Sequence, residues 1–260
     1  MKIYPSDLSD LEWEKIAPAF KVDYTRGGRP PKHSRRQILN AIFYLAKTGC
    51  QWRFLPTTYP PWQTVYTYFR KWQRNDVFEK LNHRLRKSVR ILAERDEDPS
   101  AGIIDSQSVK TAEKGPSGDS IVGKKIKGRK RHIIVDTLGL LLGCHITTAN
   151  ISDKQGAREF LNQFYLPCIQ KIWADQGYDG VPLDAFCKDK GIELELVKRK
   201  EEGFKVLPKR WIVERTFSWM SRYRRLSKDY ETLPQTTQNW CYLSMIRLMI
   251  KRIEDSKIRF

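Results

Sequence analysis

Three acidic residues, far apart in the sequence, lie within segments that are otherwise apolar or basic, where a carboxylate is unexpected. Asp105 is the only acid in the segment GIIDSQSVK, and Asp175 directly follows the apolar run KIWA. Glu214 is the only acid in KRWIVERTFSWMSRYRR, which is otherwise rich in Lys and Arg. A buried carboxylate without a partner is costly, and carboxylate oxygens are the ligands that Mg²⁺ prefers. We therefore interpret the three acids as one metal site beside cations that hold phosphates, the combination that phosphoryl transfer on a nucleic acid requires.

The surroundings of Glu214 support this interpretation but leave another open. If a helix runs from residue 208 to residue 226 at 100° per residue, Arg210 and Arg225 fall within about 40° of Glu214, and most apolar residues fall on the opposite side. The alternative is a solvated helix face with an i, i+4 pair of Arg210 and Glu214, which contributes only a few tenths of a kcal/mol. For the two aspartates, the alternative is the cap of a strand end or a surface turn.

Other chemically active side chains have simpler explanations. Asp136 precedes the turn sequence TLG, and Asp179 stands next to a glycine in a loop, so both are assigned to turns. Trp211, one helical turn from Glu214, is expected to pack in the core rather than to stack on an unpaired base. The 5 cysteines are widely spaced without a CxxC pair, which argues against a zinc site and against a disulfide framework.

The charge of the chain favours a polyanionic partner. Its 48 Lys and Arg residues outnumber its 30 Asp and Glu residues, giving a net charge of +18, and such a surplus is typical of nucleic-acid binding. The stretch GKKIKGRKRH is predicted to form an exposed turn between two strands that contacts DNA phosphates, with a solubilising loop as the alternative. Its basic residues are Lys124, Lys125, Lys127, Arg129, Lys130 and Arg131. No apolar run suits a signal peptide or a membrane span, so the chain is expected to be cytoplasmic.

The first hundred residues have the pattern of a helical module. Ser9 with Glu12 and Ser34 with Gln37 have the spacing of capping boxes, which predicts a helix after each serine. Two more helices are predicted within WQTVYTYFRKWQRN and VFEKLNHRLRKSVRILAER. Short helices joined by tight turns are typical of a helix-turn-helix DNA-binding unit, and a plain helical bundle is the alternative.

An acidic linker, AERDEDPSAG, predicts a boundary between a helical DNA-binding domain at 1–98 and a catalytic domain at 99–260. The second part has the order β-β-β-α-β-α-β-α, which is that of the ribonuclease-H-like α/β fold. Its first three strands, within GIIDSQSV, HIIVDT and LLLGCHITTA, are expected to form an antiparallel meander. In that fold, acids on the first strand, the fourth strand and the last helix converge, which would bring Asp105, Asp175 and Glu214 together.

Several blocks, in the same order along the chain, resemble one known family. IIDSQSVKT, GRKRHIIVDTLGLLLG, WADQGYDG and VERTFSWMSRYRRLSKDYE look like the DDE transposases of bacterial insertion sequences, of the insertion-sequence-five type. SDLEWEKIAP and PPWQTVYTYFRKW are similar to the N-terminal region of that family. The resemblance implies Asp105, Asp175 and Glu214 as the catalytic, metal-binding triad, with two magnesium or manganese ions.

The resemblance also implies a function and its partners. A DNA transposase of this family would bind the terminal repeats of its element as double-stranded DNA, cleave phosphodiester bonds and join the 3′-hydroxyl ends to target DNA. Synapsis of two ends implies a homodimer or a larger assembly, associated with the nucleoid. Two alternatives stay open: a non-catalytic helix-turn-helix DNA-binding protein derived from a transposase, and a ribonuclease-H-like nuclease without strand transfer.

The chain departs from the family pattern around Glu214. The related signature is Tyr-x2-Arg-x3-Glu-x6-Lys, and Arg210 and Glu214 match its two central positions. Leu207 stands at the tyrosine position and Ser221 at the lysine position. A neighbouring arginine would then have to supply the missing cation. The DNA contacts predicted at this end of the chain are Arg210, Arg222 and Arg225.

Overall fold

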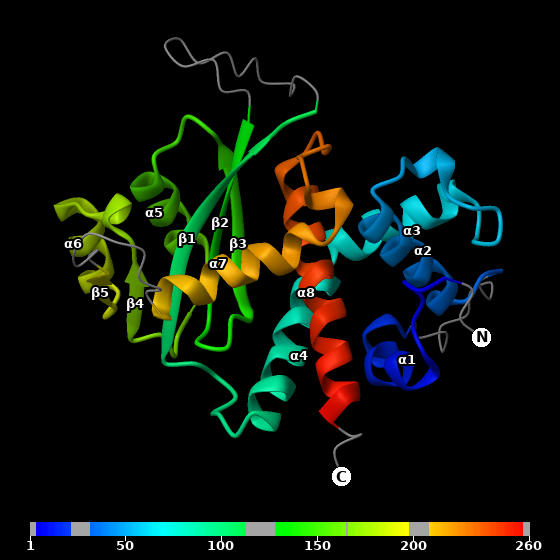
Figure 1. Cartoon of the computed structure of the whole chain (residues 1–260), viewed down its shortest axis with the longest axis horizontal. Coiled ribbons are helices and arrows are strands. Elements are labelled where there is room, and N and C mark those ends of the chain that lie inside the picture. Colours follow the sequence, from blue (N-terminus) through cyan, green and yellow to red (C-terminus); the bar gives the residue numbers. More distant parts are fainter. Residues whose placement is uncertain (1–3, 22–31, 113–127, 165, 198–207, 257–260) are drawn as a thin grey trace.

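The computed structural model describes residues 4–21, 32–112, 128–164, 166–197 and 208–256 (Figure 1). Of the residues singled out above, Lys124, Lys125, Lys127 and Leu207 lie outside these ranges. A group of N-terminal helices lies on one side of the molecule, a sheet with its own helices lies on the other, and a long C-terminal helix runs between them (Figure 1). Among the described helices, none has the length and apolar composition that crossing a membrane requires.

The N-terminal helices begin and end where the sequence predicts. Ser9 and Ser34 each cap a helix, and each forms the complete capping box, with Glu12 and Gln37 respectively. Gly49, at φ 70°, ends the second helix in the left-handed conformation that glycine adopts without strain. The helices of this region are α1 (Asp10–Ile16), η1 (Ala17–Phe20), α2 (Arg35–Thr48), η2 (Trp52–Phe54), α3 (Trp62–Arg74) and α4 (Val77–Leu92).

The second part of the described chain forms a mixed sheet and its helices in the predicted order, followed by one long helix that the sequence did not predict. The strand order is β3-β2-β1-β4-β5, in which β2 pairs antiparallel with β1 and β3, and β4 pairs parallel with β1 and β5. The elements are β1 (Ala101–Lys110), β2 (Gly128–Val135), β3 (Leu141–Thr148), α5 (Asp153–Gln163), β4 (Lys171–Ala174), η3 (Gln176–Tyr178), α6 (Val181–Asp189), β5 (Glu193–Leu196), α7 (Pro208–Ser221), η4 (Arg224–Leu226) and α8 (Pro234–Ser256). This arrangement confirms the antiparallel meander and the ribonuclease-H-like α/β fold.

Successive side chains of β1 point to opposite faces of the sheet, and each face has its own core. Ile103 belongs to the buried cluster that includes side chains of α4, α7 and α8, whereas Ile104 belongs to the cluster formed with α5 and α6. Asp105 therefore lies on the face of Ile103, toward α7, and Ser106 lies on the face of Ile104, toward α5. This alternation decides which helix each side chain of the strand can meet.

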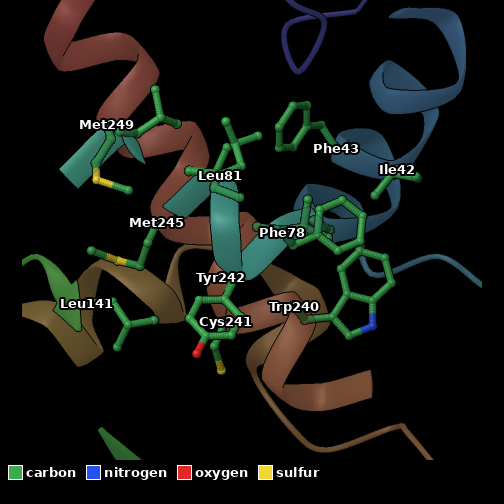
Figure 2. Close-up of a cluster of buried hydrophobic side chains, with 14 of the residues drawn as sticks. Ile42, Phe43, Phe78, Leu81, Leu141, Trp240, Cys241, Tyr242, Met245 and Met249 are labelled. Atoms are coloured by element: carbon green, nitrogen blue, oxygen red, sulfur yellow. The ribbon is translucent and has the colours of Figure 1, made fainter. Parts of the chain in front are cut away.

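Helix α8 brings both parts of the chain into one core. Its Trp240 ring stacks on Phe69 of α3, with centroids 4.8 Å apart. Figure 2 shows Trp240 and Met245 in one cluster with Phe43 of α2 and Leu141 of β3. The hydrophobic core thus crosses the boundary expected near residue 98, although the division into a DNA-binding and a catalytic domain stays a prediction.

Candidate active site

The topology brings three acids to one edge of the sheet. Ile103 of β1 pairs in parallel register with Trp173 of β4, so Asp105 and Asp175, two residues further along, stand at equivalent positions where β4 ends. Glu214 lies within α7, which packs across β1 on the face that Asp105 shares (Figure 1). Asp105 lies on the first strand, as the sequence predicts, whereas Asp175 directly follows the fourth strand, and the helix of Glu214 is followed by α8 rather than being the last.

Arg210 lies between two of the three carboxylates. Its Nη2 atom is 4.0 Å from Asp175 Oδ2 and 3.5 Å from Glu214 Oε1. Asp175 also caps the turn after β4, because its Oδ1 accepts a hydrogen bond from Gly177 N at 2.8 Å. The strand-end cap and the i, i+4 pair, which were the alternatives to a metal site, are both present. They do not exclude the site, because each leaves its carboxylate facing the same cation.

Asp105 interacts electrostatically with the same groups. The pKa of its carboxyl is raised to about 6, first by burial and further by the negative charges of Asp175 and Glu214. The Ser106 N–H, 2.7 Å from Asp105 Oδ1, and the Arg210 guanidinium lower the pKa. Carboxyl groups that disfavour one another's ionisation in this way are stabilised by a cation placed among them, and such perturbed groups are common at functional sites.

The acids suit a divalent cation in their chemistry, although they do not yet surround one. Within the described ranges, no three His, Cys, Asp or Glu side chains come close enough together to hold a metal ion as they stand. The positive charge between two of them belongs to Arg210. An all-oxygen donor set suits Mg²⁺ or Mn²⁺, and Asp175 Oδ1 lies close to the backbone at Gly177, since a Cβ there would lie 2.9 Å from it. Asp105, Asp175 and Glu214 are the residues that could hold such an ion.

A fourth carboxylate lies at the same edge, and sequence reasoning missed it. Asp153 is the first residue of α5, whose cap is Ser152. Ser106 Oγ donates a hydrogen bond to Asp153 Oδ1 at 2.6 Å, and Lys130 Nζ lies 3.0 Å from the same oxygen. These contacts join β1, β2 and α5 next to Asp105. Asp153 is separated from its partners by 47 and 23 residues, so only the serine directly after Asp105 could have hinted at it.

The basic stretch GKKIKGRKRH does not end in an exposed turn. Its last residues lie in β2, where Arg129 and Arg131 are buried and Lys130 is partly buried. Arg129 Nη1 lies 3.1 Å from Asp229 Oδ2, and Arg131 Nη1 donates to the Leu226 carbonyl at 2.7 Å. The predicted exposure of these two arginines is wrong, because their guanidinium groups hold the segment after α7 against the sheet.

Helix α7 ends earlier than the sequence predicts. It stops at Ser221, and Arg225 lies in the separate short helix η4. Arg225 is buried, with Nη2 2.7 Å from Glu231 Oε1 and Nη1 donating to the Cys50 carbonyl at 3.1 Å. The predicted position of Arg225 beside Glu214 on one helix is therefore wrong, because these contacts hold the chain in a different course after Ser221.

Trp211 on this helix and Arg222 directly after it are both exposed. Trp211 is 46% exposed, and the Arg215 guanidinium lies 4.5 Å from the centroid of its ring. The expected core packing of Trp211 is therefore wrong. Arg222 directly follows α7 and is exposed, so its predicted DNA contact stays a prediction.

Asp136 confirms the turn assigned to it and adds an ion pair. The backbone N–H groups of Leu138 and Leu140 donate to Asp136 Oδ1 at 2.9 and 2.8 Å. Asp136 Oδ2 lies 2.8 Å from Arg90 Nη1, and both side chains are buried. All of its interactions are thus internal, which sets it apart from Asp105 on the neighbouring strand.

Two family models match the chain in sequence order. Residues 8–82 match the family described as "Putative transposase of IS4/5 family", and residues 96–249 match the family described as "Transposase DDE domain". The second match covers more than half of the chain. The chain belongs to the transposase DDE domain family. The resemblance to insertion-sequence DDE transposases is thereby confirmed.

Curated relatives of this family match shorter stretches. The "Putative transposase for insertion sequence element IS402" of Burkholderia cepacia is 31% identical over 141 residues, which are 50% of this chain and 64% of the relative. The "Uncharacterized protein y4sN" of Sinorhizobium fredii is 30% identical over 74 residues, 28% of this chain and 58% of the relative. The chain thus spans about three-fifths of the length of the curated relatives it matches.

Solved Mos1 complexes match almost the whole chain at low similarity. A pre-cleavage Mos1 transpososome is 12% identical with a TM-score of 0.30, covering 95% of this chain and 85% of that chain. The Mos1 mariner paired end complex with Mn is 13% identical with a TM-score of 0.24, covering 95% and 86%. Likeness at this level carries no argument, so the fold rests on the strand order and on the family match.

Proposed function

We propose that this member of the family is a DNA transposase, which cuts phosphodiester bonds at the ends of its element and joins the 3′-hydroxyl ends to target DNA. The observation that carries the proposal is the convergence of Asp105, Asp175 and Glu214 beside Arg210 at one edge of the sheet. The match of residues 96–249 to the transposase DDE domain supports it.

The three acids are assigned to metal binding. Two magnesium or manganese ions, when bound, would activate a water molecule or the 3′-hydroxyl of a DNA end and would stabilise the leaving oxygen. Asp105 stands beside both other acids and is the residue suited to contact both ions. Arg210 is suited to hold a phosphate, because its pairs with the 31% exposed Asp175 and the 54% exposed Glu214 are screened by solvent and easily exchanged.

The outward face of α3 supports DNA binding by the N-terminal helices. A hollow of about 660 Å³ on this face is lined by Tyr66, Thr67, Arg70, Lys71, Arg74 and Asn75. Three of these side chains are cations and none is an acid, which suits contact with phosphates. We infer that α3 is the helix of a helix-turn-helix unit that meets the DNA. Lys124, Lys125 and Lys127 stay predicted phosphate contacts.

The assembly follows from the reaction. Joining two element ends to one target requires two ends held together, so we expect at least a homodimer on DNA. Element ends and target are both double-stranded DNA, which places the active protein at the nucleoid. Sedimentation of the protein with and without an end-containing duplex would measure the expected change in oligomeric state.

Cleavage of a linear duplex that carries the ends of the element, in Mg²⁺ or Mn²⁺, tests the proposal. The wild-type protein should nick at the ends and transfer them to a target plasmid. Asp105→Asn should bind the duplex but leave it uncut. Asp179→Asn changes an exposed aspartate in the loop after Asp175 and should cut like the wild type.

The outcomes separate the alternatives. Equal cutting by the wild type and Asp105→Asn would reject the three-acid site. Cutting without strand transfer would favour a ribonuclease-H-like nuclease. Binding by the wild type without cutting in either metal would favour a non-catalytic DNA-binding protein.

A further inference from the structure

We propose that a second hollow beside α3 binds one unpaired nucleotide of the DNA, with the base against aromatic rings and the neighbouring phosphates against arginines. This inference deepens the proposed function and rests on it, because it takes DNA as the molecule that lies along α3. The hollow has a volume of about 400 Å³ and lies between α3 and the segment that joins α7 to α8. The residues that line this aromatic hollow include Trp52, Trp62, Tyr66 and Tyr230, with Arg53 and Arg70.

Both parts of the chain build the aromatic hollow. Trp62 and Tyr66 belong to α3, whereas Tyr230 lies in the segment between α7 and α8. Arg225 fixes that segment, because its Nη1 donates to the Cys50 carbonyl, just after α2, at 3.1 Å. Figure 1 shows the segment between α7 and the N-terminal helices. DNA that reaches from α3 to the helix of the proposed active site would therefore pass this hollow.

The rings of the aromatic hollow combine support from the core with exposure to solvent. The ring of Trp52 lies 6.0 Å from that of the buried Trp240 and meets the ring of Tyr66 edge-on at 5.1 Å, between centroids. Tyr66 and Tyr230 are 41% and 44% exposed, and Leu233, in the same lining, is 41% exposed. Large apolar side chains that are exposed together mark a binding site. Aromatic rings stack on bases of any sequence, since every base has a π face.

The aromatic hollow also has positive charge that no carboxylate neutralises. Arg53 is exposed, and its guanidinium lies 5.8 Å from the centroid of the Trp62 ring. Neither Arg53 nor Arg70 forms an ion pair with any residue that the structure describes. Glu231 lines the hollow too, but its Oε1 is already paired with Arg225 Nη2 at 2.7 Å. Two free guanidinium groups beside aromatic rings suit a ligand that joins phosphates to a flat ring.

The position of the aromatic hollow favours an unpaired nucleotide over other occupants. Tyr66 and Arg70 line both this hollow and the 660 Å³ hollow on the outward face of α3, so the two form one surface. Bases within a duplex are stacked on each other and do not offer a face to a protein ring. A base that leaves the duplex held on α3 would enter here. A second protein would also cover the rings, but it would not satisfy the free arginines unless it were acidic.

Fluorescence of 2-aminopurine tests this inference with the full-length protein in EDTA, where metal-dependent cutting does not occur. The probe is a duplex that carries the ends of the element and one unpaired 2-aminopurine, whose fluorescence falls when the base stacks. The wild type should quench the probe and bind it more tightly than the fully paired duplex. Tyr230→Leu should bind the probe about 5- to 100-fold more weakly and lose most of the quenching.

Two matched variants separate stacking from a merely structural role. Tyr230→Phe keeps the ring and should bind and quench like the wild type. Phe54→Leu removes a 72% exposed ring that lies outside the hollow and should also behave like the wild type. If circular dichroism shows that Tyr230→Leu does not fold, Tyr66→Leu decides by the same measurement.

The arginines have their own readout in the salt dependence of binding. Arg53→Met should reduce the slope of log affinity against log salt for the probe by about one. Tyr230→Leu should leave that slope unchanged, because the ring carries no charge. An unchanged slope in Arg53→Met would overturn the assignment of phosphates to the hollow.

The outcomes keep this inference apart from the proposed function. Equal affinity of the wild type for the paired and unpaired duplexes without quenching would overturn it, as would a Tyr230→Leu protein that behaves like Phe54→Leu. If Tyr230→Leu changed the sedimentation of the DNA-free protein but not its affinity for the probe, the hollow would dock a protein instead. A wild type that cuts and transfers ends without quenching would overturn this inference alone. A wild type that quenches the probe but cuts in neither metal would reject the proposed function and leave the hollow as a DNA site.

Discussion

Replacing Asp105 with asparagine should make the metal-free protein more stable at neutral pH, although it removes a residue of the proposed active site. The carboxylate is partly buried beside Asp175 and Glu214, and its pKa is raised to about 6. Above that pH the folded protein holds a charge that burial and two like charges disfavour. Asparagine has nearly the same shape, carries no charge, and can still accept the N–H of Ser106.

The size of the effect follows from the pKa. A rise from 3.8 to about 6 corresponds to about 3 kcal/mol if no other group responds. Asp105 keeps some contact with solvent, so we expect Asp105→Asn to raise the free energy of unfolding by about 1 to 2 kcal/mol at pH 7.5. The folded carboxyl binds its proton more tightly than the unfolded one, so the wild type loses stability as the pH rises from about 4 to about 6. The advantage of asparagine should therefore disappear at low pH.

Urea unfolding in EDTA, from about pH 4 to pH 8, measures this difference. Asp136→Asn is the matched control on the neighbouring strand. Asp136 pairs with the buried Arg90 at 2.8 Å, so Asp136→Asn leaves this buried guanidinium without its carboxylate and should lower the free energy of unfolding by about 3 kcal/mol. If Asp105→Asn is no more stable than the wild type at pH 7.5, or if its advantage persists at pH 4, the three carboxylates do not repel one another as argued.

Three other changes have expected outcomes that bear on separate parts of the fold. Arg131→Met should lower the free energy of unfolding in urea by about 2 kcal/mol because it leaves buried carbonyl groups unpaired, and the exposed Lys228→Met serves as the neutral control. Gly139→Ala should lower the melting temperature more than Gly191→Ala. Both glycines have positive φ, but a Cβ at Gly139 would lie 2.9 Å from Thr216 Oγ1, whereas no atom lies within 4 Å of a Cβ at Gly191. Arg70→Ala should reduce the slope of log affinity against log salt for DNA by about one, and an unchanged slope would remove this residue from the proposed DNA surface.

Local signals allowed the helices of the first part and the order of strands along the chain to be predicted. The capping boxes of Ser9 with Glu12 and Ser34 with Gln37 are local signals of a helix start, because each cap satisfies free N–H groups of the first turn. The positions of Asp105 and Asp175 followed from the apolar runs that carry them, since parallel strands in this fold place both at one edge.

Contacts between distant segments explain what the sequence did not predict. Arg129 and Arg131 alternate along a strand as exposed basic residues would, and only the carbonyl and carboxylate groups about a hundred residues away make their burial favourable. No glycine or proline at the end of α7 signals where the helix stops. The course of the chain there depends on contacts of Arg225 with Glu231 and with the Cys50 carbonyl. The approach of Asp153 to Ser106 has the same origin.

The position of α8 in the core affects how the protein folds during its synthesis. The ribosome makes this helix after the other described elements, and until it emerges Phe69 lacks the indole ring of Trp240 that covers it. The nascent N-terminal helices therefore expose apolar surface while the sheet is still being synthesised. A polypeptide cut short before Pro234 would lack this cover, so an interrupted copy of the gene would not accumulate as a folded product.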